Sequence, residues 1–133
     1  MSQLSTADDI RGGTAQLWLH QQNMNKLLVA QSDFLHQLDP NAYDIAALQE
    51  PYLDHNHNTC VNPYWYTVYP KEHYMTPKKT RSTIFINKRL ATDSWFQVDF
   101  SSKDITTVQV QTVVGKILII NTYNDIVHPD NID

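Results

Sequence analysis

The most informative pattern in this chain is a short apolar run, Asp44 to Leu48, that ends in Gln49 and Glu50. Apolar and polar positions do not alternate in it, which is typical of a strand covered on both faces. A helix is the competing interpretation, but the run is short and Pro51 would stop a helix there. The pattern predicts a buried strand that delivers Gln49 and Glu50 to its C-terminal end, where open α/β sheets bind ligands. The simpler alternative is that Glu50 only meets water at the end of the strand.

The residues before this run predict the rest of a βαβ unit. Residues 15–23 alternate apolar and polar side chains and indicate a strand. Apolar residues then recur at helical spacing from Leu27 to Leu38, and Asn25 is expected to cap that helix. Strand, helix and strand in this order predict a right-handed crossover with the two strands parallel.

The second half of the chain predicts antiparallel strands joined by loops and turns. The resulting order, βαβ followed by four or five antiparallel strands, indicates an α+β fold with sheets packed on each other and the helix outside. The polar segments 1–14 and 126–133 are expected to be a disordered lead-in and a polar tail, with one domain over 15–125. The expected strands of the second half are residues 64–69, 82–86, 95–100, 106–113 and 116–123.

Composition narrows the class of protein. The chain has 133 residues, of which 41% are hydrophobic and 18% charged, so one folded domain is expected. A net charge of −4 argues against a protein held to nucleic acid by bulk charge alone, although a local basic patch can still do so. The single cysteine, Cys60, excludes an intrachain disulfide and fits a reducing compartment. Residues 1–14 contain no apolar stretch of the kind that a secretory signal needs, so the chain is expected to be intracellular.

Three residues are candidates for a metal and phosphate site. Asn23 and Glu50 fall at the C-terminal ends of two strands expected to be parallel neighbours, so their side chains should converge on one edge of the sheet. An amide oxygen and a carboxylate are hard ligands that suit Mg²⁺. Tyr123 ends the last strand and would reach the same edge if that strand were parallel to the others in the central sheet. The alternatives are polar residues that merely end strands and a tyrosine that packs at a sheet edge.

A short basic segment is a candidate contact for nucleic acid. Lys78, Lys79 and Arg81 lie in one loop, and Trp65 and Tyr74 could stack on bases. The alternative is a solvated surface that happens to carry positive charges.

A group of loop histidines offers a second metal hypothesis. His55, His57, Cys60 and His73 loosely resemble a zinc ligand set. Their spacing matches no standard zinc finger, and solvated loop histidines are the simpler interpretation.

Four segments, taken together, resemble the endonuclease/exonuclease/phosphatase superfamily. The resemblance runs in order from about Gln16 to Asp125 and is closest to the endonuclease domain of non-LTR (LINE-type) retrotransposons. Gln-Glu-Pro-Tyr is its most specific element. The segments are residues 21–26 (QQNMNK), 44–52 (DIAALQEPY), 81–88 (RSTIFINK) and 119–125 (IINTYND).

The resemblance implies a fold, an activity and roles for the candidate residues. Members of the superfamily form a four-layer α/β/β/α sandwich and hydrolyse phosphodiester or phosphomonoester bonds with Mg²⁺ or Mn²⁺. By this resemblance Glu50 would bind the metal, Asn23 would help to place metal and phosphate, and Tyr123 would contact the scissile phosphate. DNA would be the substrate and the nucleus the place of action.

The chain also departs from the pattern of the family. The family carries an Asp-x-Asn motif and a Ser-Asp-His motif in the second half of the domain, where they serve to activate water and stabilise the leaving group. In this chain Asp-x-Asn occurs only in the first half, at residues 39–41 and 54–56, and Ser-Asp-His does not occur. The resemblance therefore covers the N-terminal half of the domain, and hydrolysis is expected to be impaired. An exposed sheet face would then call for a missing C-terminal half or for self-association. The alternatives are a non-catalytic α/β module that binds nucleic acid or protein, and a phosphatase for small molecules or lipids.

Overall fold

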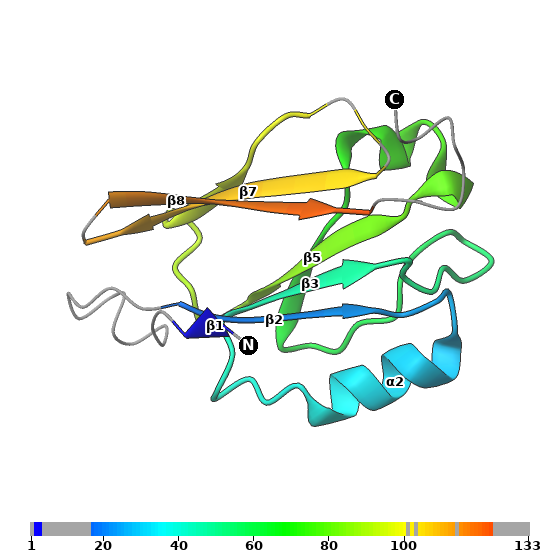
Figure 1. Cartoon of the computed structure of the whole chain (residues 1–133), viewed down its shortest axis with the longest axis horizontal. Coiled ribbons are helices and arrows are strands. Elements are labelled where there is room, and N and C mark those ends of the chain that lie inside the picture. The colour runs from blue at the N-terminus through cyan, green and yellow to red at the C-terminus, as the bar shows by residue number, and fades with distance from the viewer. Residues whose placement is uncertain (1, 4–16, 101, 103, 114, 124–133) are drawn as a thin grey trace.

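The computed structural model describes residues 2–3, 17–100, 102, 104–113 and 115–123, and these form a mixed α+β fold (Figure 1). The described part of the chain contains two β-sheets and one α-helix, as the sequence pattern predicts. Two 3₁₀ helices, η1 and η2, lie in the segment that connects strands β4 and β5. The elements are β1 (Ser2–Gln3), β2 (Trp18–Asn23), α2 (Leu28–Gln37), β3 (Ile45–Gln49), β4 (Trp65–Val68), η1 (Lys71–Tyr74), η2 (Pro77–Lys79), β5 (Ser82–Asn87), β6 (Trp95–Gln97), β7 (Ile105–Thr112) and β8 (Gly115–Thr122).

The first sheet contains the predicted βαβ unit. Its strand order is β1-β2-β3-β5-β4, and β2 and β3 pair in parallel with Asn23 opposite Gln49. The pairs β3–β5 and β5–β4 are antiparallel. Two residues of the segment that we expected to be disordered, Ser2–Gln3, form β1 and pair with β2 next to Trp18 and Leu19. The rest of that segment and the expected polar tail, residues 126–133, lie outside the described residues.

The second sheet contains the last three strands in the antiparallel order β6-β7-β8. The condition under which we expected Tyr123 to reach the ends of β2 and β3 is therefore not met, because β8 does not belong to their sheet. In Figure 1, however, β8 runs in the same direction as β2 and β3, one layer away.

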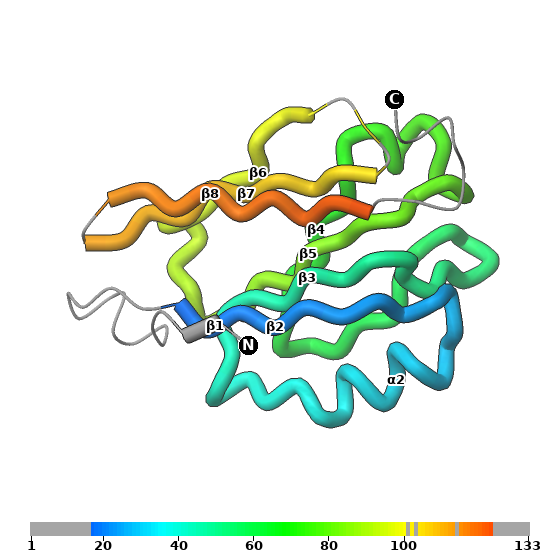
Figure 2. Tube along the Cα trace, viewed as in Figure 1, coloured from blue at the N-terminus to red at the C-terminus, as the bar shows by residue number. Residues whose placement is uncertain are grey.

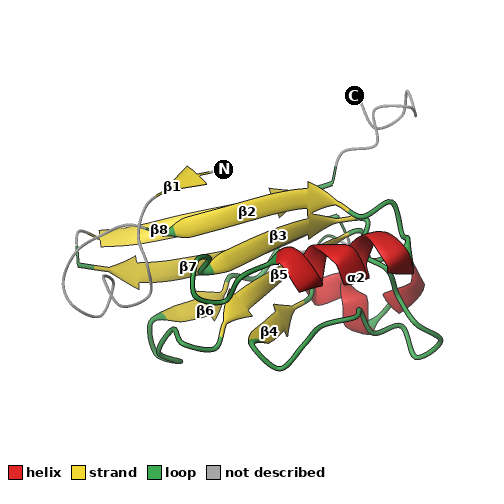
Figure 3. Cartoon of the chain, turned by 90° about the horizontal axis from the view of Figure 1, so that it is seen from below, coloured by secondary structure: helices red, strands yellow, loops and turns green. Residues whose placement is uncertain are grey.

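The elements stack as helix, first sheet and second sheet (Figure 2). One apolar core fills the space between the sheets, and a second lies between the first sheet and α2. Figure 3 shows β2 and β8 along one side of the molecule and β4 and β6 along the other. The buried residues between the sheets are Leu17, Ile45, Val68, Ile84, Ile86, Leu90, Val108 and Val110. Those beneath α2 are Met24, Phe34, Leu35, Leu38, Ala46, Leu48, Trp65 and Phe85.

The apolar run of β3 is covered on both faces, as its lack of alternation predicts. Ile45 contributes to the core between the sheets, whereas Ala46 and Leu48 contribute to the core beneath α2. β8 is different, because its inward residues pack on the core while Leu118 and Ile120 are 52% and 57% exposed on the outer face. That apolar face therefore stays open to solvent in the described part of the chain.

No helix in the described part of the chain is long and apolar enough to span a membrane.

Candidate functional site

Glu50 has an unusual backbone conformation at the end of β3. Its φ angle is 47°, in the left-handed region that costs a residue with a Cβ roughly 1 kcal/mol or more. Two hydrogen bonds hold it there, because its N–H donates to the carbonyl of Arg81 at 2.8 Å and its carbonyl accepts from the N–H of Lys26 at 2.9 Å. Strain of this kind persists where the surroundings enforce it and is enriched at functional sites.

The turn that contacts Glu50 is left-handed as well. Asn25 and Lys26 have φ angles of 53° and 60°. The side-chain oxygen of Asn23 accepts a hydrogen bond from the N–H of Asn25 at 2.7 Å, which stabilises this turn. The prediction that Asn25 caps the helix is wrong, since Leu27 occupies the N-cap position without any side-chain cap. Asn25 instead belongs to the turn that holds Glu50.

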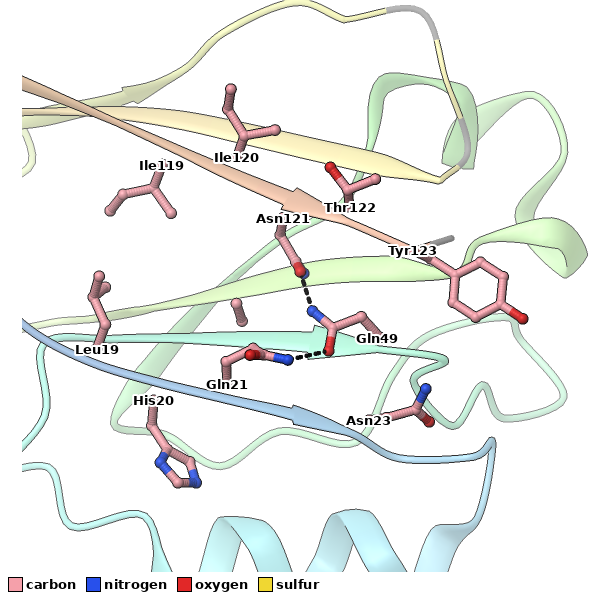
Figure 4. A pocket seen from close by; sticks show the side chains of 11 residues that line it. Leu19, His20, Gln21, Asn23, Gln49, Ile119, Ile120, Asn121, Thr122 and Tyr123 are labelled. Carbon is pink, nitrogen blue, oxygen red and sulfur yellow. Dashed lines mark hydrogen bonds between the residues drawn. The ribbon is translucent and has the colours of Figure 1, made fainter. Parts of the chain in front are cut away.

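A chain of hydrogen-bonded side-chain amides connects the two sheets near the C-terminal ends of β2 and β3 (Figure 4). Gln21 of β2 donates to Gln49 of β3 at 2.9 Å, and Gln49 donates to Asn121 of β8. The amide nitrogen of Asn121 donates in turn to the carbonyls of Leu48 at 2.9 Å and Thr83 at 2.7 Å. Asn121 is 3% exposed and was not among the predicted site residues. A buried amide in an otherwise apolar strand is the signal that could have identified it.

Tyr123 lies just beyond β8 and is connected to Glu50 through Arg81. The guanidinium of Arg81 lies 5.3 Å from the centre of the Tyr123 ring, a cation–π contact. Asp104 contacts both residues, since its carboxylate lies 3.7 Å from Nε of Arg81 and its carbonyl accepts from the N–H of Tyr123 at 2.8 Å. Figure 4 shows the ring of Tyr123 and the side-chain amide of Asn23 at the same end of the two sheets.

We refer to Asn23, Gln49, Glu50, Arg81 and Tyr123 as the strand-end rim. They come from both sheets and from the residue before β5, yet a chain of contacts connects them. Asn23 and Tyr123 also line an open groove of about 620 Å³ between β2 and β8. The three residues predicted from the sequence to form one site thus lie at one end of the molecule, although Tyr123 reaches it from the second sheet.

The basic loop residues divide between two places. Lys78 lines a groove of about 320 Å³ together with Lys26, Tyr52 and His57, whereas Lys79 is exposed on η2 beside it. Arg81 belongs to the rim. Trp65 is 2% exposed in the core beneath α2, so the prediction that it stacks on bases is wrong, whereas Tyr74 is exposed.

The histidine hypothesis for a second metal site finds no support among the described residues. No group of three or more His, Cys, Asp or Glu side chains is placed there so that it could hold a metal ion. His73 is not a solvated loop histidine either, because it is 4% exposed, stacks on Tyr69 and lies 2.6 Å from the hydroxyl of Thr80. Burial lowers the pKa of His73, and the charge of His57 lowers it further.

The donor chemistry of the rim fits Mg²⁺ better than zinc. Mg²⁺ prefers oxygen ligands, keeps several waters and needs only one or two protein carboxylates. Glu50, a half-buried residue, carries a carboxylate, and the side-chain oxygen of Asn23 retains a second lone pair beyond its bond to Asn25.

Comparisons with known proteins identify no relative. No protein-family model, no curated protein and no solved structure matches this chain. The assignment of function therefore depends on the chemistry of the strand-end rim and on the segments of the sequence that resemble a known superfamily.

Proposed function

We propose that this chain is the N-terminal part of an endonuclease/exonuclease/phosphatase domain of the retroelement type, and that its strand-end rim binds Mg²⁺ and a phosphodiester of DNA. The observation that carries the proposal is Glu50, whose strained backbone is held between the β2–α2 turn and the start of β5. The proposal includes the four-layer α/β/β/α architecture of the family, and the helix and the two sheets would form three of its layers.

Each rim residue has a role in this proposal. Glu50 and Asn23 would hold the metal through their side-chain oxygens, with the Asn25 N–H fixing the orientation of the Asn23 amide. When bound, Mg²⁺ supplies positive charge that stabilises a phosphate in the transition state of its hydrolysis. Tyr123, with Arg81 against its ring, would direct its hydroxyl toward a phosphate oxygen.

The position of the basic residues supports an anionic polymer as the ligand. Lys26 belongs to the turn that holds Glu50, and Lys78 lines the adjacent groove with it. A phosphodiester chain that passed the rim would meet both ammonium groups in succession, together with the exposed Lys79.

Rapid hydrolysis is not part of the proposal. The second half of the chain contains neither of the two motifs with which the superfamily activates water and stabilises the leaving group. We therefore expect metal and phosphate binding, with plasmid nicking that is slow or absent in this chain alone.

Mn²⁺ titration of the isotopically labelled chain tests the site without relying on activity. Paramagnetic broadening should be strongest at the side-chain amide of Asn23 and the backbone N–H of Glu50, and Glu50→Gln should abolish it. Glu72→Gln, the same chemical change in η1, is the matched control and should leave the broadening unchanged. Broadening that survives Glu50→Gln, or that centres on other acidic residues, would contradict the proposed site.

A second candidate function is nucleic-acid binding without hydrolysis. The groove that contains Lys26 and Lys78 favours it, because this groove does not depend on the metal ligands. Binding of a DNA duplex should weaken steeply with salt and should be reduced by Lys26→Gln and Lys78→Gln. Lys116→Gln, on the exposed face of β8, is the control. Mn²⁺-independent binding without any nicking would favour this function over the first.

A further inference from the structure

Two edge strands lie along the same side of the molecule. β8 ends the second sheet, and no described strand pairs with its outer edge. β2 is followed in the first sheet only by the two residues of β1, which pair with Trp18 and Leu19. The outer edge of His20 to Asn23, opposite the edge that pairs with β3, has no described partner strand. The groove of about 620 Å³ lies between these two edges, and Figure 3 shows both strands on one side.

The free edge of β8 is long, apolar and nearly uncharged. It contains eight residues, which corresponds to roughly 27 Å of strand. Lys116 is its one charged residue, and it contains no proline. Natural edge strands are normally short, charged, bulged or covered, because an exposed edge of this kind pairs readily with another strand.

We propose that β8 pairs antiparallel with β8 of a second copy of this chain, around a two-fold axis that passes beside Ile119. In this register Leu118 lies opposite Ile120 of the partner on the outer face, and Ile119 lies opposite its own copy on the inner face. Lys116 lies opposite Thr122, so no like charges face one another across the axis. The strand is therefore complementary to itself, as a two-fold interface requires.

The same symmetry accounts for the open groove. An axis perpendicular to the second sheet turns the first-sheet edges of the two copies, each formed by β1 beside Trp18 and Leu19 and by the rest of β2, toward one another in the layer below the paired β8 strands. The inward side chains of the partner's β8 then lie over the groove between β2 and β8. One contact thus covers the apolar wall formed by Leu19, Ala47 and Ile119 in both copies at once. The inference does not depend on metal or nucleic-acid binding.

The oligomeric state of the purified chain tests this pairing directly. Light scattering after size exclusion should give twice the 15.4 kDa of one chain, with dissociation on dilution. The double substitution Leu118→Lys and Ile120→Lys should give monomers, because it places like charges opposite one another in the proposed register. Phe96→Lys is the matched control, since Phe96 is 55% exposed on the same face but lies on β6, at the opposite edge of the sheet.

Charge reversal separates a lost interface from a lost fold. A chain with Leu118→Glu and Ile120→Glu should also be monomeric, and mixing it with the lysine variant should restore a dimer of one chain of each kind. A wild-type chain that is monomeric at every concentration would overturn the proposal. So would a Phe96→Lys variant that dissociates equally, or lysine and glutamate variants that fail to pair.

Discussion

The amide of Asn121 should be among the largest single side-chain contributors to stability outside the apolar cores. Asn121→Ala removes two hydrogen bonds donated to the carbonyls of Leu48 and Thr83 and one accepted from Gln49. A buried hydrogen bond contributes about 1 kcal/mol, and its loss leaves the partner groups buried without it. The three bonds together correspond to a loss of about 3 kcal/mol in the free energy of unfolding.

Thermal and urea denaturation at a fixed chain concentration measure this loss. For a domain of 133 residues, about 3 kcal/mol lowers the melting temperature by about 10 °C. Thr122→Ala is the control, because Thr122 is the next residue of β8 and is exposed, so its loss should stay within about 0.5 kcal/mol. A fixed concentration matters because any self-association would add to the apparent stability.

A double-mutant cycle with Gln49→Ala isolates the bond between the two amides. Residues in direct contact typically couple by about 0.5 kcal/mol or more, so the two losses should add to more than the loss in the double variant. A loss of less than about 1 kcal/mol in Asn121→Ala, or a cycle without coupling, would refute the view that this amide joins the two sheets.

Three further predictions test the rim and the loops. Glu50→Gly should be more stable than Glu50→Ala by about 1 kcal/mol in urea denaturation, because glycine tolerates the left-handed backbone at this position; equal stabilities would contradict the strained geometry. The lowered pKa of His73 means that the fold holds its neutral form, so stability should be complete above the ordinary histidine pKa of about 6.5 and should fall as the pH drops below it. His73→Phe keeps a planar ring stacked on Tyr69 and should reduce the loss of unfolding free energy as the pH falls below 7. An NMR titration in which the pKa of His73 is not lowered would contradict the prediction. Gln31→Ala should cost about 2–3 kcal/mol in thermal denaturation, since its amide bonds Thr59, the carbonyl of Cys60 and the N–H of Tyr52, and a smaller loss than in an exposed helix substitution such as Ser32→Ala would rule this out.

Local patterns were sufficient for the order of the elements. The unbroken apolar run of β3 requires cover on both faces, and the structure supplies α2 on one side and the second sheet on the other. The alternation in residues 106–113 likewise predicts the strand β7. Residues 116–123 were expected to form a buried apolar strand, but β8 exposes Leu118 and Ile120 on its outer face. The prediction of parallel β2 and β3 is confirmed, because a single helix between two strands leaves few other connections.

Predictions that depended on a single residue were less successful. Asn25 was expected to cap the helix, but it turns in the left-handed region and stabilises the loop that holds Glu50. Trp65 was expected at a nucleic-acid surface, but it fills the core beneath α2. In both cases the tertiary contacts available to the side chain outweigh the local preference of its residue type.

The sequence by itself determined the order of the main strands and placed Asn23 and Glu50 at the ends of neighbouring parallel strands, although it missed β1 and extended β6 beyond Gln97. Only the tertiary structure decided that β8 lies in a second sheet, that Arg81 connects Glu50 with Tyr123, and that Asn121 joins the two sheets. The physical reason is distance along the chain. The periodicity of apolar residues predicts which side of a strand or helix is buried, but not which distant segment packs against it. Partners such as Gln49 and Asn121 are separated by 72 positions in the chain and meet only when the two sheets pack.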